Sequence, residues 1–161
     1  MTWPSLQSCS QLQHALHETL RKSPILPIVS RTAIRDTVLP RGAGPDGHSP
    51  AAVPKGTPIT ISLYHMHRRE EEWGTAGDAW MPERWTGRRL GPKYAPFSAG
   101  RRVCIGEQLS MTELSYVTAR VLQRFDLIKS PPGQDNLTKG YKVLVQPKNG
   151  VKVRLHYASL D

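Results

Sequence analysis

The 161-residue sequence has little cysteine, few acidic residues for its number of basic ones, and no long hydrophobic run. Its two cysteines, Cys9 and Cys104, lie in a polar helix-like run and in an arginine-rich loop, so we expect no disulfide framework. No apolar run approaches the length that crosses a bilayer and no signal peptide is recognisable, so we expect no membrane-spanning segment in this chain. With 14 prolines, 13 glycines and 38% hydrophobic residues, the composition favours one loop-rich domain over a compact helical bundle.

The 22 lysines and arginines outnumber the 13 acidic residues and give a formal net charge of +9. Such a charge suits a nucleic-acid binder, but the arginines are spread along the chain and no basic helix with interleaved aromatic residues occurs. We therefore expect an acidic partner or cofactor and no nucleic acid.

The first half of the chain shows one helical pattern followed by several strand patterns. Leucines at every fourth position place an apolar face on a helix over residues 6–22, which Pro24 ends. The apolar stretch 25–29 contains another proline and is expected to be extended. His65 and His67 continue a strand-like alternation, and we interpret both as structural. The patterns predict a strand, a turn-rich loop, a second strand and a short helical turn, at residues 31–39, 39–50, 59–63 and 68–73.

The second half is predicted to hold an irregular segment, a long helix and a β-rich tail. Residues 74–99 have no regular pattern but carry tryptophans and prolines, which predicts an ordered segment with a functional or docking role. The tail, residues 127–157, is predicted to form short strands, with Asn149 and Gly150 turning a hairpin between the last two. Residues 107–126 contain neither glycine nor proline and predict a helix with an apolar face made of Leu114, Val117, Val121 and Phe125.

Cys104 lies in the loop "FSAGRRVCIG", residues 97–106, directly before the predicted long helix. A cysteine thiolate is a strong metal ligand, and both the adjacent arginines and the positive N-terminal end of the helix favour the charged form. Gly100 and Gly106 carry no Cβ, so backbone N–H groups can approach the sulfur and tune its electron donation. Phe97 is expected to shield the sulfur from water. The loop is therefore a candidate metal site.

The metal at this loop is not expected to be zinc. Zinc takes four protein ligands, or three and a water, and no Cys-x-x-Cys or His-x-x-x-His pair accompanies Cys104. The nearest candidates are His65 and His67. A single cysteine points to a metal whose other ligands come from a cofactor. Haem fits, because its porphyrin supplies four ligands and its two propionates require cations.

Several segments resemble the cytochrome P450 superfamily, in the order in which that family has them. The "FSAGRRVCIG" loop matches the family's haem-binding signature at all five defining positions, including Cys104. "ETLR", residues 18–21, is similar to the family's Glu-x-x-Arg helix motif, and "PERW", residues 82–85, to its Pro-Glu-Arg-Phe segment. Glu113 stands nine residues after the cysteine, where the family often has glutamate. The resemblance covers about residues 6–157.

Finer wording resembles one subgroup of that family. "SRTAIRDTVLPRGAGPDG", "VPKGT", "MHRREEEWG" and "VLQRFD" are similar to the fungal branch that hydroxylates n-alkanes and fatty acids. The resemblance therefore implies an apolar small-molecule substrate of the alkane or fatty-acid class.

The resemblance implies a mainly helical α+β fold of the haem-thiolate type, with residues 1–161 forming the C-terminal part of an incomplete domain. The expected elements are the Glu-x-x-Arg helix, small β-sheets, an irregular meander, the cysteine loop, a long helix and β-hairpins. The family's central helix with its acid–alcohol pair, its membrane anchor and its access loops have no counterpart in this sequence. We therefore expect the C-terminal third of a longer enzyme, with weak or no haem retention and poor solubility when isolated.

The resemblance assigns residues to haem b, iron protoporphyrin IX. Cys104 is the proximal iron ligand and the catalytic residue; the alternative is a buried structural thiol. Arg102 and Arg31, the latter five residues before Asp36, are expected to meet the propionates; the alternatives are a solvated arginine and a strand-edge charge. The cofactor-binding residues are thus Arg31, Phe97, Gly100, Arg102, Cys104 and Gly106.

Other residues receive roles around the haem. Glu18, Arg21 and Arg84 are expected to form a buried ion network that holds the irregular segment on the first helix. Four basic residues are expected to form a surface for an acidic reductase: Arg88, Arg89, Lys93 and Arg101. The alternative is a solvated charged face. Ile25, Leu26, Ile28 and Tyr141 are expected to contact substrate; the alternative for the three aliphatic residues is ordinary core.

The implied activity is that of a monooxygenase, which hydroxylates alkanes or fatty acids with O2 and electrons from NADPH–cytochrome P450 reductase. The family's location is the endoplasmic reticulum membrane. Two alternatives stay open: an inactive truncated remnant, and a non-catalytic haem-binding or sensing protein.

Overall fold

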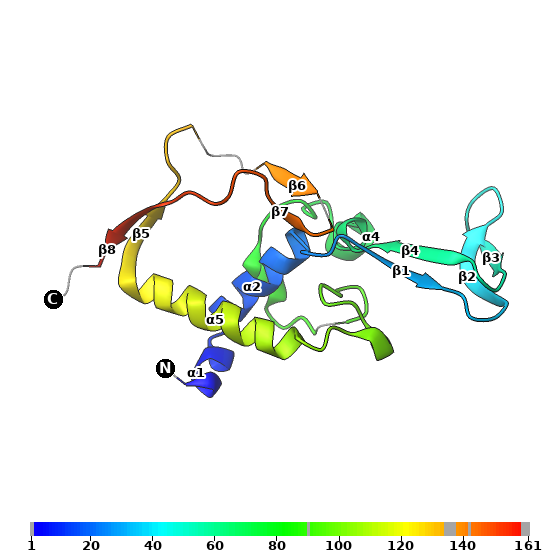
Figure 1. Ribbon diagram of the computed structural model, residues 1–161, viewed down its shortest axis with the longest axis horizontal. Coiled ribbons are helices and arrows are strands. Elements are labelled where there is room, and N and C mark those ends of the chain that lie inside the picture. The colour runs from blue at the N-terminus through cyan, green and yellow to red at the C-terminus, as the bar shows by residue number, and fades with distance from the viewer. Residues whose placement is uncertain (1, 90, 134–137, 142, 159–161) are drawn as a thin grey trace. The chain divides into compact units, whose positions relative to one another are not determined.

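The computed structural model describes residues 2–89, 91–133, 138–141 and 143–158. The chain divides into two compact units, one made of Met1–Pro27 and Leu63–Asp161 and the other of Ile28–Ser62. Among the described residues, no helix is both long enough and apolar enough to cross a bilayer. Helices and small antiparallel sheets both occur, in agreement with the predicted α+β class (Figure 1).

The first unit contains the helices and the C-terminal strands. Its helices are α1 (Trp3–Ser8), α2 (Ser10–Lys22), α3 (Leu63–Met66), α4 (Glu70–Trp73) and α5 (Glu107–Arg124), with the 3-10 turns η1 (Pro82–Trp85) and η2 (Gly100–Arg102). Its strands are β5 (Phe125–Lys129), β6 (Lys139–Tyr141), β7 (Val145–Pro147) and β8 (Arg154–Tyr157). The helical turn predicted at residues 68–73, the helix predicted at 107–126 and the irregular course of 74–99 are confirmed.

The single helix predicted over residues 6–22 is two helices with a break at Cys9. Thr2 caps α1 reciprocally with Ser5, and the Ser8 hydroxyl bonds back to the Ser5 carbonyl. Serine side chains bond to nearby backbone groups and so compete with helical hydrogen bonds, and cysteine has a low helix propensity. The Ser8–Cys9–Ser10 sequence therefore favours a break in the helix. The Gln13 side chain then donates to the Leu6 carbonyl (3.0 Å), which satisfies the end of α1.

The hydrophobic core of the first unit lies where α1 and α2 meet α5. Leu6, Leu12 and Leu16 are buried together. From α5, the partly buried side chains of Met111, Leu114 and Ala119 pack against them. Ser115 is buried among these residues and its hydroxyl accepts from the Gln13 amide (3.1 Å). The predicted apolar face of α5 is therefore wrong in part, since Val117 of that face is exposed.

His65 and His67 are not in a strand. β4 (Pro58–Ser62) ends before them and the chain turns into α3, with the His67 N–H donating to the Leu63 carbonyl (2.9 Å). The alternation predicted both residues on one face, whereas His65 is exposed and His67 is buried. Helical spacing separates positions two residues apart, which explains the difference.

The second unit consists of two antiparallel strand pairs. β1 (Ile28–Thr32) pairs with β4, and β2 (Thr37–Ala43) pairs with β3 (Ser49–Val53) with an irregularity in register. The strand predicted at 31–39 is thus interrupted, because residues 33–36 turn. The Gly56 N–H donates to the Ala33 carbonyl (2.8 Å) and the Lys55 N–H to the Asp36 carboxylate (2.7 Å), which holds that turn.

The hairpin predicted around Asn149 and Gly150 is wrong. A turn is present there, with Gly150 at φ 71°, but the strands on either side do not pair with each other. β7 instead pairs with β6, and β8 pairs with β5, which follows α5 directly (Figure 1). The turn residues therefore predicted a change of direction correctly and the strand partners wrongly.

Candidate functional site

The cysteine loop joins the irregular segment to α5, and backbone hydrogen bonds hold it on both sides of Cys104. The Cys104 N–H donates to the Phe97 carbonyl (2.9 Å), and the Cys104 carbonyl accepts from the Glu107 N–H at the start of α5 (3.2 Å). Both cysteines of the chain are free and exposed, so the Cys104 sulfur is neither buried nor bridged to Cys9. The backbone of the loop is thus held while its thiol faces outward.

The two glycines of the loop serve different purposes. Gly100 has φ 72°, in the left-handed region that other residues rarely adopt, and it opens η2. Gly106 has φ −88° and precedes α5. A Cβ on Gly106 would lie 3.8 Å from the Cys104 Sγ, an ordinary contact distance. Backbone conformation therefore requires glycine at position 100, and space beside the sulfur does not require it at position 106.

The surroundings of the sulfur fit a haem. Val103 and Ile105, on either side of Cys104, are exposed apolar residues, and Arg101 and Arg102 of the same loop are exposed cations. An accessible thiol with apolar and cationic neighbours suits a flat apolar ring that carries acidic arms. Among the described residues, no group of three or more His, Cys, Asp or Glu side chains is arranged to hold a metal ion.

Glu18 and Arg21 of α2 form a fully buried ion pair. Arg21 donates from Nε to Glu18 Oε2 and from Nη2 to Glu18 Oε1, both at 2.9 Å. Arg84 of η1 donates from Nε to Glu18 Oε1, also at 2.9 Å. The structure thus brings together the three residues predicted to form the ion network.

Both arginines also donate to backbone carbonyls of the irregular segment. Arg21 donates to Gly77 (2.7 Å) and Ala79 (3.0 Å), and Arg84 donates to Ala76 (3.0 Å). An irregular segment has few ladder hydrogen bonds, so side-chain donors satisfy its carbonyls. The network thereby attaches residues 76–79 to α2.

The sequence-based prediction missed two further donors to Glu18. The Met81 N–H donates to Oε1 (2.9 Å), and the Trp85 indole N–H donates to Oε2 (3.1 Å). Burial favours the neutral acid, but the hydrogen bonds from Arg21, Met81 and Arg84 outweigh it and lower the pKa of Glu18. Tryptophan in place of the family's phenylalanine at position 85 was the available signal, because only tryptophan carries an N–H.

A cluster of aromatic rings lies beside this network and was also not predicted. Trp85 and Tyr94 are in edge contact (4.7 Å between centroids), and Tyr94 also contacts His17 and His67. The Tyr94 hydroxyl donates to the His17 carbonyl (3.2 Å). Aromatic contacts therefore join α2, η1 and the approach to the cysteine loop.

Arg31 and Ile28 belong to β1 in the second unit. The Arg31 guanidinium donates to the Ser30 carbonyl (2.9 Å), and Ile28 is exposed. The assignment of Arg31 to a propionate and of Ile28 to substrate therefore stays a prediction.

Two segments predicted to contact substrate adjoin each other in the first unit. The Val145 N–H, at the start of β7, donates to the Ile25 carbonyl (2.8 Å), and Val145 pairs with Tyr141 across the hairpin. Ile25 is 47% exposed and Leu26 is partly buried, so Ile25 is not an ordinary core residue. The Tyr141 side chain lies outside the described part of the structure.

The residues of the predicted basic surface differ in their surroundings. Arg88 stacks over the Trp73 ring (4.2 Å) and donates to the Glu72 carbonyl, while Lys93 pairs with the Glu72 carboxylate. Arg89 and Arg101 are exposed. The positive charges of Arg88 and Lys93 therefore interact with groups of this chain, while those of Arg89 and Arg101 face solvent.

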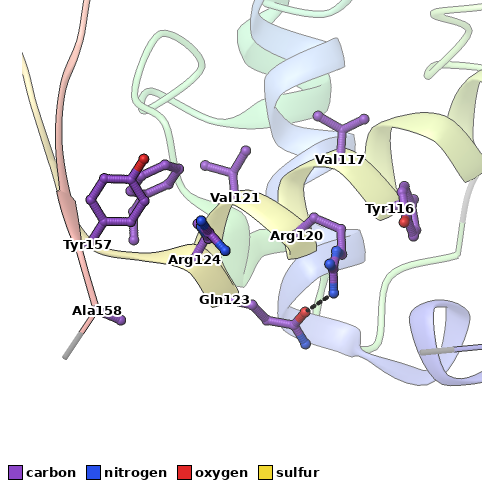
Figure 2. A pocket seen from close by; sticks show the side chains of 9 residues that line it. Tyr116, Val117, Arg120, Val121, Gln123, Arg124, Tyr157 and Ala158 are labelled. Carbon is purple, nitrogen blue, oxygen red and sulfur yellow. Dashed lines mark hydrogen bonds between the residues drawn. The ribbon is translucent and has the colours of Figure 1, made fainter. Parts of the chain in front are cut away.

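A separate pocket of about 740 Å³ lies at the far end of α5 (Figure 2). Val117, Val121 and Tyr157 line it, with Arg120 and Arg124 at its side. α5 has 18 residues, so its ends are about 27 Å apart. The pocket contains none of the predicted site residues and is not part of the cysteine site.

Comparison with known proteins finds relatives that are named cytochrome P450 proteins. The chain is 44% identical over 154 residues to cytochrome P450 monooxygenase g430 of a Fusarium species, covering 96% of this chain and 27% of that protein. It is 47% identical over 131 residues to cytochrome P450 monooxygenase alt2 of Alternaria solani, covering 80% and 24%. It is 46% identical over 135 residues to cytochrome P450 52A6 of Candida tropicalis, covering 82% and 26%.

The chain thus spans roughly a quarter of the length of these curated relatives. The family model described as cytochrome P450 matches residues 1–155, which include the buried ion network, the irregular segment and the cysteine loop. The chain belongs to the cytochrome P450 family.

Proposed function

We propose that this chain is the haem-thiolate part of a monooxygenase and that Cys104 is its iron ligand. The observation that carries the proposal is the Cys104 thiol, which is free and exposed in a loop held to Phe97 on one side and to α5 on the other. Haem is the cofactor of the family to which the chain belongs. When bound, haem supplies the oxygen chemistry of the reaction, and its thiolate ligand donates electron density.

The chain's own residues bind and orient the cofactor. Cys104 provides the thiolate, and Arg102 of the same loop provides positive charge for a propionate. Arg31 belongs to the second unit, and its assignment to a propionate rests on the resemblance alone. Phe97, the first residue of the loop, is half-buried and its carbonyl accepts from the Cys104 N–H, while Gly100 permits the left-handed turn before Cys104. The buried network of Glu18, Arg21 and Arg84 then holds the segment from which the loop departs.

The proposed substrate is an alkane or a fatty acid, and the proposed electron donor is NADPH–cytochrome P450 reductase at the endoplasmic reticulum membrane. The sequence phrases shared with the fungal n-alkane hydroxylases support this substrate class. The exposed aliphatic side chain of Ile25 is suited to an apolar chain. Exposed Arg89 and Arg101 provide positive charge for an acidic reductase.

Carbon monoxide difference spectroscopy of the reduced chain, loaded with haem, tests the proposal. The red-shifted Soret band of thiolate ligation is expected for the natural chain and for Cys9→Ser. Cys104→Ser is expected to lose the band, because an alcohol does not replace the thiolate. A band that persists in Cys104→Ser, or haem that does not bind at all, would contradict the proposal. NADPH-dependent turnover of a fatty acid with added reductase separates an enzyme from a haem-binding protein.

A further inference from the structure

His67 is a fully buried histidine that the proposed chemistry does not use. It follows α3, and its ring lies among aromatic rings, 5.4 Å from Tyr94 and 6.4 Å from Trp73 between centroids. Burial, together with the positive charges of Arg21 and Arg68, lowers its pKa from 6.5 to about 4. The ring is therefore neutral at neutral pH.

The hydrogen bonds of His67 determine where its ring carries the proton. The Ala95 N–H donates to His67 Nε2 (3.0 Å), and a backbone N–H can only donate. Nε2 therefore accepts, and the ring proton is on Nδ1. Nδ1 is buried and has no hydrogen-bond partner among the described residues. An unpartnered buried donor is unfavourable, so the hydrogen bond to Ala95 is kept at the expense of a second bond from the same ring.

His67 also contacts the buried ion network through its backbone. Its carbonyl accepts from Arg21 Nη1 at 2.7 Å. One residue thus bonds to the ion network through its main chain and to Ala95 through its side chain.

Ala95 lies two residues before the start of the cysteine loop. Its carbonyl accepts from the Ser98 N–H (3.0 Å), and the Phe97 carbonyl, within that turn, accepts from the Cys104 N–H (2.9 Å). A continuous series of hydrogen bonds and short backbone links therefore runs from Arg21 through His67 and Ala95 to Cys104.

We propose that His67 is a positioning residue. In its Nδ1–H form it holds the Ala95 backbone through a hydrogen bond, and because its own backbone is bonded to the ion network, it restricts the motion of the cysteine loop. The anchoring rests on the hydrogen bonds alone. Its consequence for metal binding rests on the proposed function, in which Cys104 is the iron ligand.

Amide hydrogen exchange of the full chain, without haem, tests the anchoring. His67→Phe keeps a ring among the aromatic residues but removes the acceptor, and it also removes the unpartnered Nδ1–H. We expect the Ala95 and Cys104 amides to exchange at least about tenfold faster, with α2 unchanged. His67→Gln offers an acceptor and is expected to restore protection. His65→Phe, an exposed position two residues away, is the matched control.

Unchanged exchange at Ala95 in a folded His67→Phe chain would overturn the anchoring. The natural chain provides a second readout that needs no variant: nitrogen NMR should show an unprotonated Nε2 and a protonated Nδ1 at His67. The reverse protonation, or a ring that exchanges between both forms, would equally overturn the proposal.

The carbon monoxide spectrum separates this inference from the proposed function. Faster Ala95 exchange in His67→Phe, together with a weaker thiolate band restored by His67→Gln, is the expected result. If the natural chain lacks the thiolate band while Ala95 still responds, the proposed function fails and the anchoring stands. If the band is normal and Ala95 does not respond, the anchoring fails and the proposed function stands.

Discussion

Glu18 accepts more hydrogen bonds than any other side chain in the network described above. Five donor groups reach its two oxygens: two from Arg21 and one each from Arg84, the Met81 backbone and the Trp85 indole. A carboxylate out of contact with water is stable only when its lone pairs are satisfied in this way. The residues supplying these donors come from α2, η1 and the residue before η1, so one carboxylate joins distant parts of the chain.

Arg21→Ala is expected to destabilise the chain by about 3–5 kcal/mol, because it leaves the buried Glu18 carboxylate without its main partner. It also frees the carbonyls of Gly77 and Ala79, so haem loading should fall and not only the rate of turnover. Urea denaturation and haem titration measure these effects.

Arg69→Ala is the matched control for that measurement. Arg69 pairs with Glu71 on the surface, and an exposed pair contributes about 0–1 kcal/mol. Equal losses in the two variants would show that the Glu18–Arg21 pair is not a special contributor to stability.

The lowered pKa of His67 predicts a loss of stability in mild acid. Between pH 6.5 and pH 4 the unfolded chain takes up a proton at this residue and the folded chain does not, so the unfolded state is favoured as pH falls. The free energy of unfolding should decrease by roughly 3 kcal/mol over that interval from His67. Denaturant titrations at several pH values measure it.

His67→Phe should remove this part of the pH dependence. The further loss below pH 4.5, where the lowered pKa of Glu18 matters, should remain in the variant. An unchanged slope between pH 6.5 and pH 4 in His67→Phe would assign the effect to other groups.

At the scale of elements, α5 connects the cysteine loop with the hydrophobic core. Gly106, the last residue of the loop, is joined to the first turn of α5, since the Ser110 N–H donates to the Gly106 carbonyl (2.8 Å). Its middle packs on α1 and α2 through Met111 and Leu114. A stable position for α5 is therefore a condition for a stable position of Cys104.

Leu16→Ala is expected to destabilise the chain by about 2–5 kcal/mol, because Leu16 is only 8% exposed and the truncation leaves a cavity between α2 and α5. Leu122→Ala, at a residue that is 60% exposed on α5, should change stability by less than about 0.5 kcal/mol. Thermal unfolding of both variants measures the difference. A large effect at Leu122 with none at Leu16 would place the core on the opposite face of α5.

At the scale of the whole molecule, the two compact units differ in how much they bury. In the second unit the buried hydrophobic residues among those described are Val29 and Val53. The first unit contains the leucine core, the aromatic cluster and the ion network. Two-stranded pairs are marginal by themselves, so the second unit should open more easily than the first.

Hydrogen exchange of the full chain is expected to show this difference directly. Amides of β1–β4 should be protected at least about tenfold less than those of α2. Equal protection in β2 and α2 would mean that both units open together in one cooperative step. The comparison needs no variant, since α2 is the reference within the same molecule.

The sequence alone determined the features that depend on neighbours along the chain. Leucine spacing in residues 6–22 and the absence of glycine and proline from 107–126 predicted helices, because helical hydrogen bonds join residues four apart. The loop around Cys104 was recognisable for the same reason, since its glycines, arginines and cysteine are contiguous.

Only the tertiary structure decided which distant groups meet. Local patterns placed His67 in a strand and paired the strands around Gly150, whereas contacts across the chain put His67 beside Ala95 and β8 beside β5. Trp85 was visible in the sequence, but not the carboxylate to which it donates. Burial and strand pairing depend on partners tens of residues away, and a local pattern does not specify those partners.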